Sequence, residues 1–150
     1  MEREPDIDAG TEAAEAAIAA SVTVETRELA AIFAGGFLGA LARSALAQSL
    51  GVAPDRWPWP TFAVNMLAAA LLGYAIAWLG EHHPRTLYAR AFFATGLCGA
   101  LSTFSTVMVE LIHLAERSWP LACGYGAASV AGGLAAVTLG VRLGARGRGA

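Results

Sequence analysis

The stretch Thr61–Gly80 reads TFAVNMLAAALLGYAIAWLG and carries no charged side chain in its 20 residues. An α-helix rises about 1.5 Å per residue and the hydrocarbon core of a bilayer is about 30 Å thick, so about 20 apolar residues cross it. A soluble helix of this length needs a polar face, which this stretch lacks. It therefore predicts a membrane-spanning helix and disfavours the alternative, a soluble helical bundle.

Three further apolar runs are of similar length. Leu29–Leu50 contains one charge, Arg43, Ala91–Ile112 contains one, Glu110, and Leu121–Val141 contains none. The connecting segments are too short for a separate soluble domain. We therefore predict an all-α membrane protein in which residues 29–144 form four transmembrane helices. Tryptophans, which settle at lipid headgroups, lie near the expected helix ends: Trp57, Trp59, Trp78 and Trp119.

The charge is divided unevenly along the chain. Residues 1–28 hold eight acids and two arginines, a net charge of −6, while the remaining residues hold eight arginines and four acids, a net charge of +4. Residues 1–28 lack the basic start and long apolar stretch of a secretory signal. We expect an acidic, disordered N-terminal tail there and a short basic tail over residues 145–150.

Small and hydroxyl side chains crowd the middle of the third run. Gly96, Gly99, Ser102, Thr103, Ser105 and Thr106 surround Phe104, and most of these residues have poor helix propensity. One interpretation is that the hydroxyls bond back to their own helix. The other is a helix break, whose freed carbonyls coordinate a cation and whose restarting half-helix attracts an anion. The pattern favours the break and an ion site between Gly99 and Thr106.

Other polar groups at membrane depth leave two interpretations open. Arg43 shares a helix face with Gly35 and Gly39, and its guanidinium either snorkels to the interface or lines a vestibule. The Asn65 amide either bonds a neighbouring helix or offers an N–H to an anion. Tyr125 and Ser129, four residues apart, form hydroxyl bonds between helices or line a path.

The sequence gives no sign of catalysis. Two histidines are adjacent, His82 and His83, and His113 lies on another segment, which is not a usual zinc spacing. No histidine or aspartate lies at membrane depth beside a serine, and Glu110 is near the end of its run. We expect the protein not to be an enzyme.

Four motifs resemble the Fluc (CrcB) family of fluoride channels. They are GGFLGALAR at 35–43, TFAVN at 61–65, GLCGALSTFSTVMVE at 96–110, and the spacing of Tyr125 and Ser129. The third motif is the most specific, and the resemblance covers about residues 30–143. Residues 1–28 lie outside it.

The resemblance implies a passive fluoride channel of the cell inner (plasma) membrane that lowers fluoride toxicity. It implies an antiparallel, dual-topology dimer with two pores and a broken third helix. A structural sodium ion at the dimer interface would be held by the backbone carbonyls of Gly99 and Ser102. The implied fluoride path comprises Asn65, Phe104, Ser105, Thr106, Tyr125 and Ser129, with Arg43 at a vestibule and Glu110 near a pore end.

The chain departs from the family pattern at three positions. Val107 stands where the family usually has a second pore phenylalanine, Ser44 replaces a tyrosine, and Ala68 replaces a glycine. Seven arginines fall on the side of the termini and two on the other, a bias that favours termini in the cytoplasm. Since a dual-topology homodimer should be nearly unbiased, the chain either forms a homodimer or pairs with an oppositely inserted paralogue that supplies the missing aromatic ring.

Two other functions compete with this one. A small multidrug antiporter also has four short helices in an antiparallel dimer, but it needs a membrane-embedded carboxylate in its first helix, and Leu29–Leu50 contains no acid. A non-conducting assembly protein would use its glycine faces only for packing. Selective fluoride flux separates the three functions.

Overall fold

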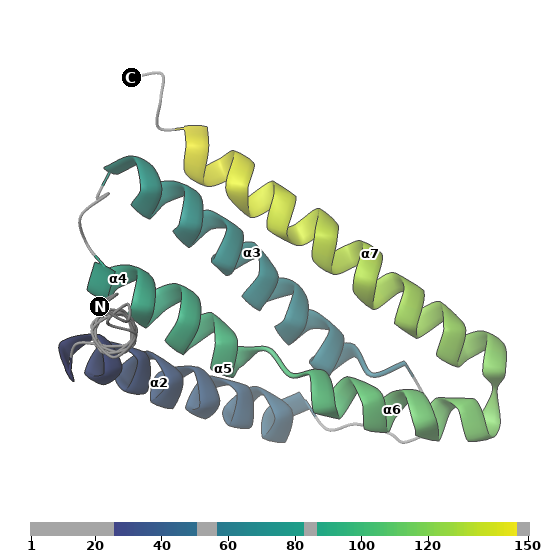
Figure 1. The fold of residues 1–150 in the computed structure, drawn as a ribbon. Helices are drawn as coiled ribbons and strands as arrows, with labels where there is room; N and C mark the ends of the chain where they lie inside the picture. The colour runs from purple at the N-terminus through teal and green to yellow at the C-terminus, as the bar shows by residue number, and fades with distance from the viewer. Residues whose placement is uncertain (1–25, 51–56, 83–86, 147–150) are drawn as a thin grey trace, which may run out of the picture.

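The computed structural model describes residues 26–50, 57–82 and 87–146, and every described element is helical (Figure 1). Four helices in this part of the chain are long and apolar enough to cross a membrane, which confirms the predicted all-α fold with four spans. In chain order the elements are α2 (Thr26–Leu50), α3 (Trp59–His82), α4 (Leu87–Arg90), the π-helix η1 (Ala91–Cys98), α5 (Gly99–Leu101), α6 (Phe104–Arg117) and α7 (Trp119–Gly144).

Apart from the end of α2 at the predicted Leu50, the spans begin and end a few residues outside the predicted runs. Pro60 and Pro120 are each the second residue of their helix, where a missing N–H costs no helical hydrogen bond. α2 begins at Thr26, three residues before the expected boundary at Leu29. The rest of the predicted N-terminal tail, residues 1–25, and residues 147–150 of the predicted C-terminal tail lie outside the described residues.

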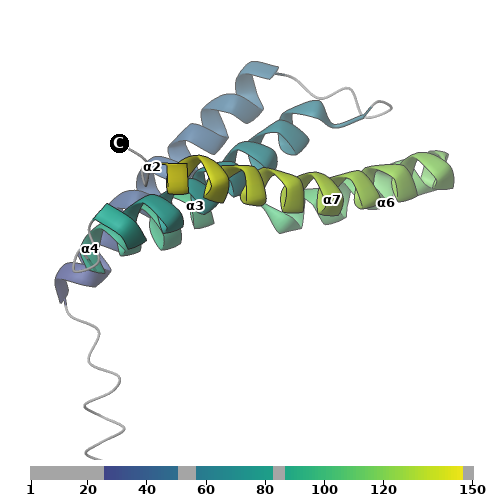
Figure 2. The ribbon, with the colours of Figure 1, turned by 90° about the horizontal axis from the view of Figure 1, so that it is seen from above.

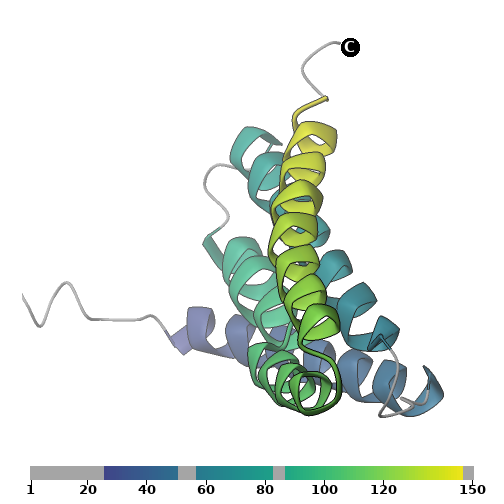
Figure 3. The ribbon, with the colours of Figure 1, turned by 90° about the vertical axis from the view of Figure 1, so that its right-hand side faces the viewer.

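The helices associate in two pairs. α3 packs mainly on α7, and α2 packs mainly on η1 (Figure 1). The third span, from α4 to α6, lies between α2 and α3, and α6 runs beside the first part of α7 (Figure 2). The chain turns back from α6 into α7 at Ser118 (Figure 3).

Glycines allow α2 to approach the third span closely. A Cβ atom on Gly35 would overlap the carbonyl oxygen of Phe92, and one on Gly39 would overlap that of Leu97. From the other side, a Cβ on Gly96 would lie 2.6 Å from the carbonyl oxygen of Ile32. The face predicted from the spacing of Gly35 and Gly39 is therefore a backbone-to-backbone contact, as small residues permit in membranes.

A second glycine contact joins α3 to α7. A Cβ on Gly73 would overlap the carbonyl oxygen of Val137, and one on Gly140 would overlap that of Ala70. Gly144 continues the contact, because its Cβ would lie 2.7 Å from the carbonyl oxygen of Tyr74. Each helix pair is thus held by close packing rather than by large interlocking side chains.

The third span is broken where its hydroxyl residues begin. α5 ends at Leu101, Ser102 is extended with φ −72° and ψ 155°, and Thr103 is extended with φ −144° and ψ 121°. α6 then restarts at Phe104. The predicted break is confirmed, and it lies within the predicted range from Gly99 to Thr106. The π-helical segment that precedes it was not predicted.

Candidate functional site

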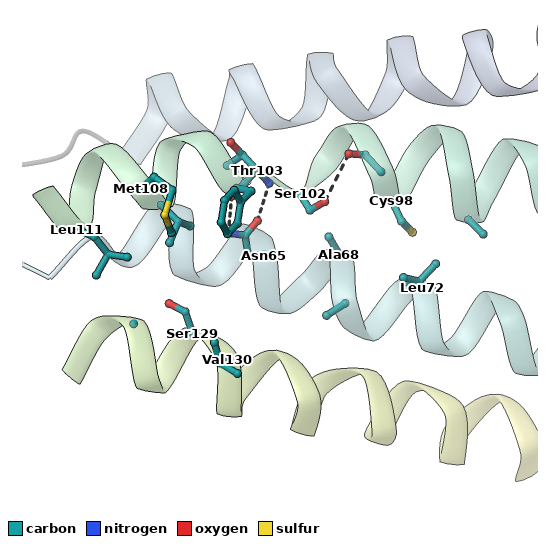
Figure 4. A pocket seen from close by; sticks show the side chains of 16 residues that line it. Asn65, Ala68, Leu72, Cys98, Ser102, Thr103, Met108, Leu111, Ser129 and Val130 are labelled. Atoms are coloured by element: carbon teal, nitrogen blue, oxygen red, sulfur yellow. Dashed lines mark hydrogen bonds between the residues drawn. The ribbon is translucent and has the colours of Figure 1, made fainter. Parts of the chain in front are cut away.

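Asn65 of α3 holds the break from one side. Its Oδ1 accepts a hydrogen bond of 2.8 Å from the N–H of Thr103, and its Nδ2 donates one of 3.1 Å to the Thr103 carbonyl (Figure 4). An asparagine amide carries two N–H donors, and these bonds use only one of them. The amide therefore bonds a neighbouring helix, as one of the two interpretations predicted, and retains one N–H for a further acceptor.

Thr103 caps the helix that restarts after the break. Its Oγ1 accepts a hydrogen bond of 3.3 Å from the N–H of Thr106 and lies 2.9 Å from the Thr106 hydroxyl. The Ser105 hydroxyl lies 3.4 Å from the same Oγ1. A threonine in this position satisfies one of the free N–H groups at the start of a helix. The hydroxyl cluster thus organises the N-terminus of α6.

A cavity of about 590 Å³ opens beside the break, between α3, the third span and α7 (Figure 4). Asn65, Ala68 and Leu72 enter it from α3, and Ser129 and Val130 face them from α7 (Figure 4). None of the described residues that line it carries a charged side chain. Its predicted site residues are Asn65, Gly99, Ser102, Phe104 and Ser129, and Val107 is also part of its wall.

Two groups on this cavity are poorly satisfied by the rest of the chain. The Ser129 hydroxyl is buried and forms no hydrogen bond of ordinary geometry with the described residues, although the Tyr125 hydroxyl lies within hydrogen-bonding reach of it. The Phe104 ring is 76% exposed, although it lies in the middle of its span. The cavity thus presents a buried hydroxyl and an exposed aromatic side chain on the same wall.

A smaller cavity of about 200 Å³ lies on the other side of the break. Arg43 and Ser44 line it from α2, Thr61 from α3, and Thr106 and Glu110 from α6. Thr103 lines both cavities, so a single extended residue separates them. Arg43 and Glu110 thus line the same cavity.

Glu110 connects three elements through its carboxylate. Its Oε1 accepts a hydrogen bond of 2.5 Å from the Thr61 hydroxyl, and its Oε2 accepts one of 2.7 Å from the Tyr125 hydroxyl. Thr61 is 8% exposed and Tyr125 is fully buried. Both oxygens of the carboxylate are therefore occupied by hydroxyl donors, which lowers the cost of a carboxylate at this depth.

Aromatic rings close the core beneath this carboxylate. The ring of Trp57 lies 5.3 Å from that of Tyr125 at an interplanar angle of 88°, and 5.9 Å from that of Phe62. Val107 is 8% exposed and belongs to the same buried cluster as Tyr125. At position 107 this chain thus packs a small side chain into the buried cluster that also contains Tyr125.

The predicted site residues divide between the two cavities. Five of them line the larger cavity, while Arg43, Thr106 and Glu110 line the smaller one. Ser105 and Tyr125 line neither, and the Tyr125 proton is directed at Glu110. Sequence reasoning missed the roles of Thr61, Thr103 and Trp57. The first two stood within the quoted motifs, but nothing in the sequence indicated the contact of Trp57 with Tyr125.

A family model and several named relatives match this chain, and they agree with one another. The family model described as CrcB-like protein, Camphor Resistance (CrcB), matches residues 30–141. A protein of Mycobacterium bovis named "Fluoride-specific ion channel FluC 1" is 53% identical over 114 residues, which cover 75% of this chain and 86% of that protein. One of Mycolicibacterium paratuberculosis with the same name is 50% identical over 118 residues, 78% of this chain and 89% of that protein. "Fluoride-specific ion channel FluC 2" of Symbiobacterium thermophilum is 41% identical over 123 residues, 80% of this chain and 99% of that protein.

Proposed function

The chain belongs to the CrcB-like family, and from this premise we propose how it works as a fluoride channel. It is a multi-pass protein of the plasma membrane, and it provides a passive exit for cytoplasmic fluoride. The observation that carries the mechanism is the larger cavity, where hydrogen-bond donors and an aromatic ring meet without any charged side chain. A drug antiporter needs a membrane-embedded carboxylate in its first helix. The acid of α2, Glu28, lies in the first turn of that helix, so this function finds no support.

The larger cavity suits a small, strongly hydrated anion. Fluoride must exchange its water for other donors, and the Ser129 hydroxyl and the second Asn65 N–H can supply them. The edge of an aromatic ring is electropositive, so Phe104 adds a weak attraction. Because no cationic side chain lines the cavity, the anion binds weakly enough to leave.

The smaller cavity serves as the vestibule of this path. The positive charge of Arg43 raises the local concentration of anions there. Glu110 would repel them, but both of its oxygens accept bonds from hydroxyl groups, which disperses its charge. Thr106 lies in the vestibule and Ser105 next to it, so we place these hydroxyls with Tyr125 and Ser129 along the polar track between the two cavities.

A second subunit completes the larger cavity. The exposed Phe104 ring stands on the open side of the broken span, where an oppositely inserted copy can cover it. Such an antiparallel dimer contains two equivalent paths, and each subunit places its own ring in the interface. The position of Phe104 supports this assembly, because its exposed side chain stands at the open edge of a cavity that also contains Asn65 and Ser129.

A sodium ion fits the break between the subunits. The carbonyls of Gly99 and Ser102 lie where the helix ends, and backbone oxygen is a suitable ligand for a hard cation. Among the described residues no three histidine, cysteine or acidic side chains gather, so the proposed site does not rely on side chains of these types. The ion would supply one positive charge to a centre of low dielectric constant.

The partner is either a second copy or a paralogue. Val107 leaves one ring position of the path without an aromatic side chain, and the arginines are unevenly distributed between the two sides. An oppositely inserted paralogue would supply the missing ring. Expression of this chain alone in a fluoride-sensitive host decides the question, because full rescue by a crosslinked homodimer removes any need for a second chain.

The function is tested by fluoride efflux from liposomes containing the purified full chain, measured with a fluoride electrode. We expect fluoride-selective flux that needs no proton gradient and no second substrate. Asn65→Ala should abolish the flux while leaving the dimer intact by crosslinking. A folded dimer without fluoride flux would contradict the proposed function, and proton-coupled drug exchange would restore the antiporter.

A further inference from the structure

Two N–H groups at the break are diverted from their helical partners. In an α-helix the carbonyl of each residue accepts from the N–H four residues later. A continuous third span would therefore pair the Gly99 carbonyl with the Thr103 N–H, and the Ser102 carbonyl with the Thr106 N–H. In the structure the Thr103 N–H donates to Asn65 Oδ1 at 2.8 Å, and the Thr106 N–H donates to Thr103 Oγ1 at 3.3 Å.

The two diversions leave two carbonyls without a backbone donor among the described residues. The Gly99 carbonyl accepts only a long bond of 3.4 Å from the hydroxyl of Ser102. Ser102 is itself extended, so its carbonyl is turned away from the helix direction. These carbonyls belong to the same two residues that would hold the cation.

We propose that the Asn65 amide and the Thr103 hydroxyl are positioning residues for the cation site, each keeping one carbonyl ligand free by occupying the N–H that would otherwise close the helix over it. This role rests on the proposed channel function but concerns the backbone and not the fluoride path. The second bond of Asn65, from Nδ2 to the Thr103 carbonyl, fixes the peptide between the two ligands. Thr103 is only 9% exposed, so it is held firmly between its neighbours.

The test uses the full chain in lipid bilayers, with ¹³C labels in the carbonyls of Gly99 and Ser102, followed by solid-state NMR during sodium titration. N-methylglucamine chloride serves as the cation that cannot bind. We expect both carbonyl signals of the wild type to shift with sodium. The sodium concentration at half-shift should rise about tenfold or more for the Gly99 signal in Asn65→Ala and for the Ser102 signal in Thr103→Val, the usual size of an effect behind a metal ligand.

Matched variants separate positioning from general damage. Thr103→Ser keeps the hydroxyl and should restore sodium binding. Thr138→Val makes the same change as Thr103→Val at an exposed hydroxyl that donates to its own helix at 2.8 Å, and should change nothing. Wild-type sodium affinity in both Asn65→Ala and Thr103→Val would overturn the proposal, as would carbonyl signals that ignore sodium in the wild type.

Fluoride efflux is measured on the same samples. A sodium response without fluoride flux would leave this inference standing and remove the proposed function. Fluoride flux without a sodium response would leave the proposed function standing and remove this inference. The two proposals can therefore fail independently.

Discussion

The hydroxyl of Tyr125 on α7 donates a hydrogen bond of 2.7 Å to the carboxylate of Glu110 on α6, 15 residues earlier in the chain. The Thr61 hydroxyl of α3 occupies the other oxygen of the same carboxylate. A single acid thus joins three helices near one end of the membrane-spanning bundle. Its role in holding these helices together can be tested by mutation.

Glu110→Ala should destabilise the protein by about 1–3 kcal/mol, because it leaves two buried hydroxyls without an acceptor. The free energy of unfolding in mild detergent gives the comparison. Glu116→Ala, at an exposed position on the same helix, should stay within about 0.5 kcal/mol of wild type. Equal stabilities of the two variants would show that the carboxylate does not hold the helices together.

Phe104→Ala should reduce fluoride efflux at least about tenfold, since the ring is expected to contact the anion directly. Phe33→Ala is its control, because the two rings are 76% and 77% exposed and both lie within spans. The control should retain wild-type flux in the same liposome assay. If both variants lose flux equally, exposed aromatic rings matter for membrane insertion rather than for the path.

Arg43→Gln should lower fluoride flux about threefold or more at low ionic strength, because the vestibule loses its attraction for anions. The deficit should shrink as inert salt is added, since screening acts within about 10 Å at 0.1 M. Arg142→Gln, exposed in the last turn of α7, provides the comparison. A deficit that is independent of salt would mean that Arg43 acts by packing and not by charge.

Gly35→Ala should weaken the contact of α2 with η1, because its methyl group would overlap the Phe92 carbonyl oxygen. Forcing an atom into such a contact costs about 1–3 kcal/mol. Gly124→Ala meets nothing within 4 Å and should be neutral, or stabilising by up to about 1 kcal/mol through helix propensity. Thermal unfolding of both variants in detergent compares their stabilities. A Gly35→Ala variant that is more stable than Gly124→Ala would contradict the close contact of α2 with η1.

Much of the fold follows from the sequence, for a simple physical reason. The length of the uncharged stretch Thr61–Gly80 is matched to the bilayer, so it predicts a span without knowledge of any neighbour. The break was also predictable, because glycines and hydroxyls in mid-span oppose a regular helix. The bilayer limits the length and composition of each membrane helix separately, so these features can be predicted from the sequence of one chain.

The partners of the site residues could not be predicted in the same way. Asn65 left two interpretations open because an amide at membrane depth serves either a helix or a ligand equally well, and only the position of Thr103 decides which group it bonds. Tyr125 and Glu110 depend similarly on how α6 turns back into α7. Trp57 gave no signal, because an interfacial tryptophan is expected at a helix start whether or not it covers a tyrosine.

The π-helical segment Ala91–Cys98 sets the rotational phase of everything that follows it. A π-helix closes its hydrogen bonds over five residues instead of four, so the number of residues in this segment fixes the direction in which the half-span beyond it faces. A deletion before Gly96 would leave every motif intact and still change the direction of the Phe104 side chain relative to its cavity. The spacing of residues between Arg90 and Gly99 is therefore a constraint in its own right, one that tolerates substitution far better than a change in length.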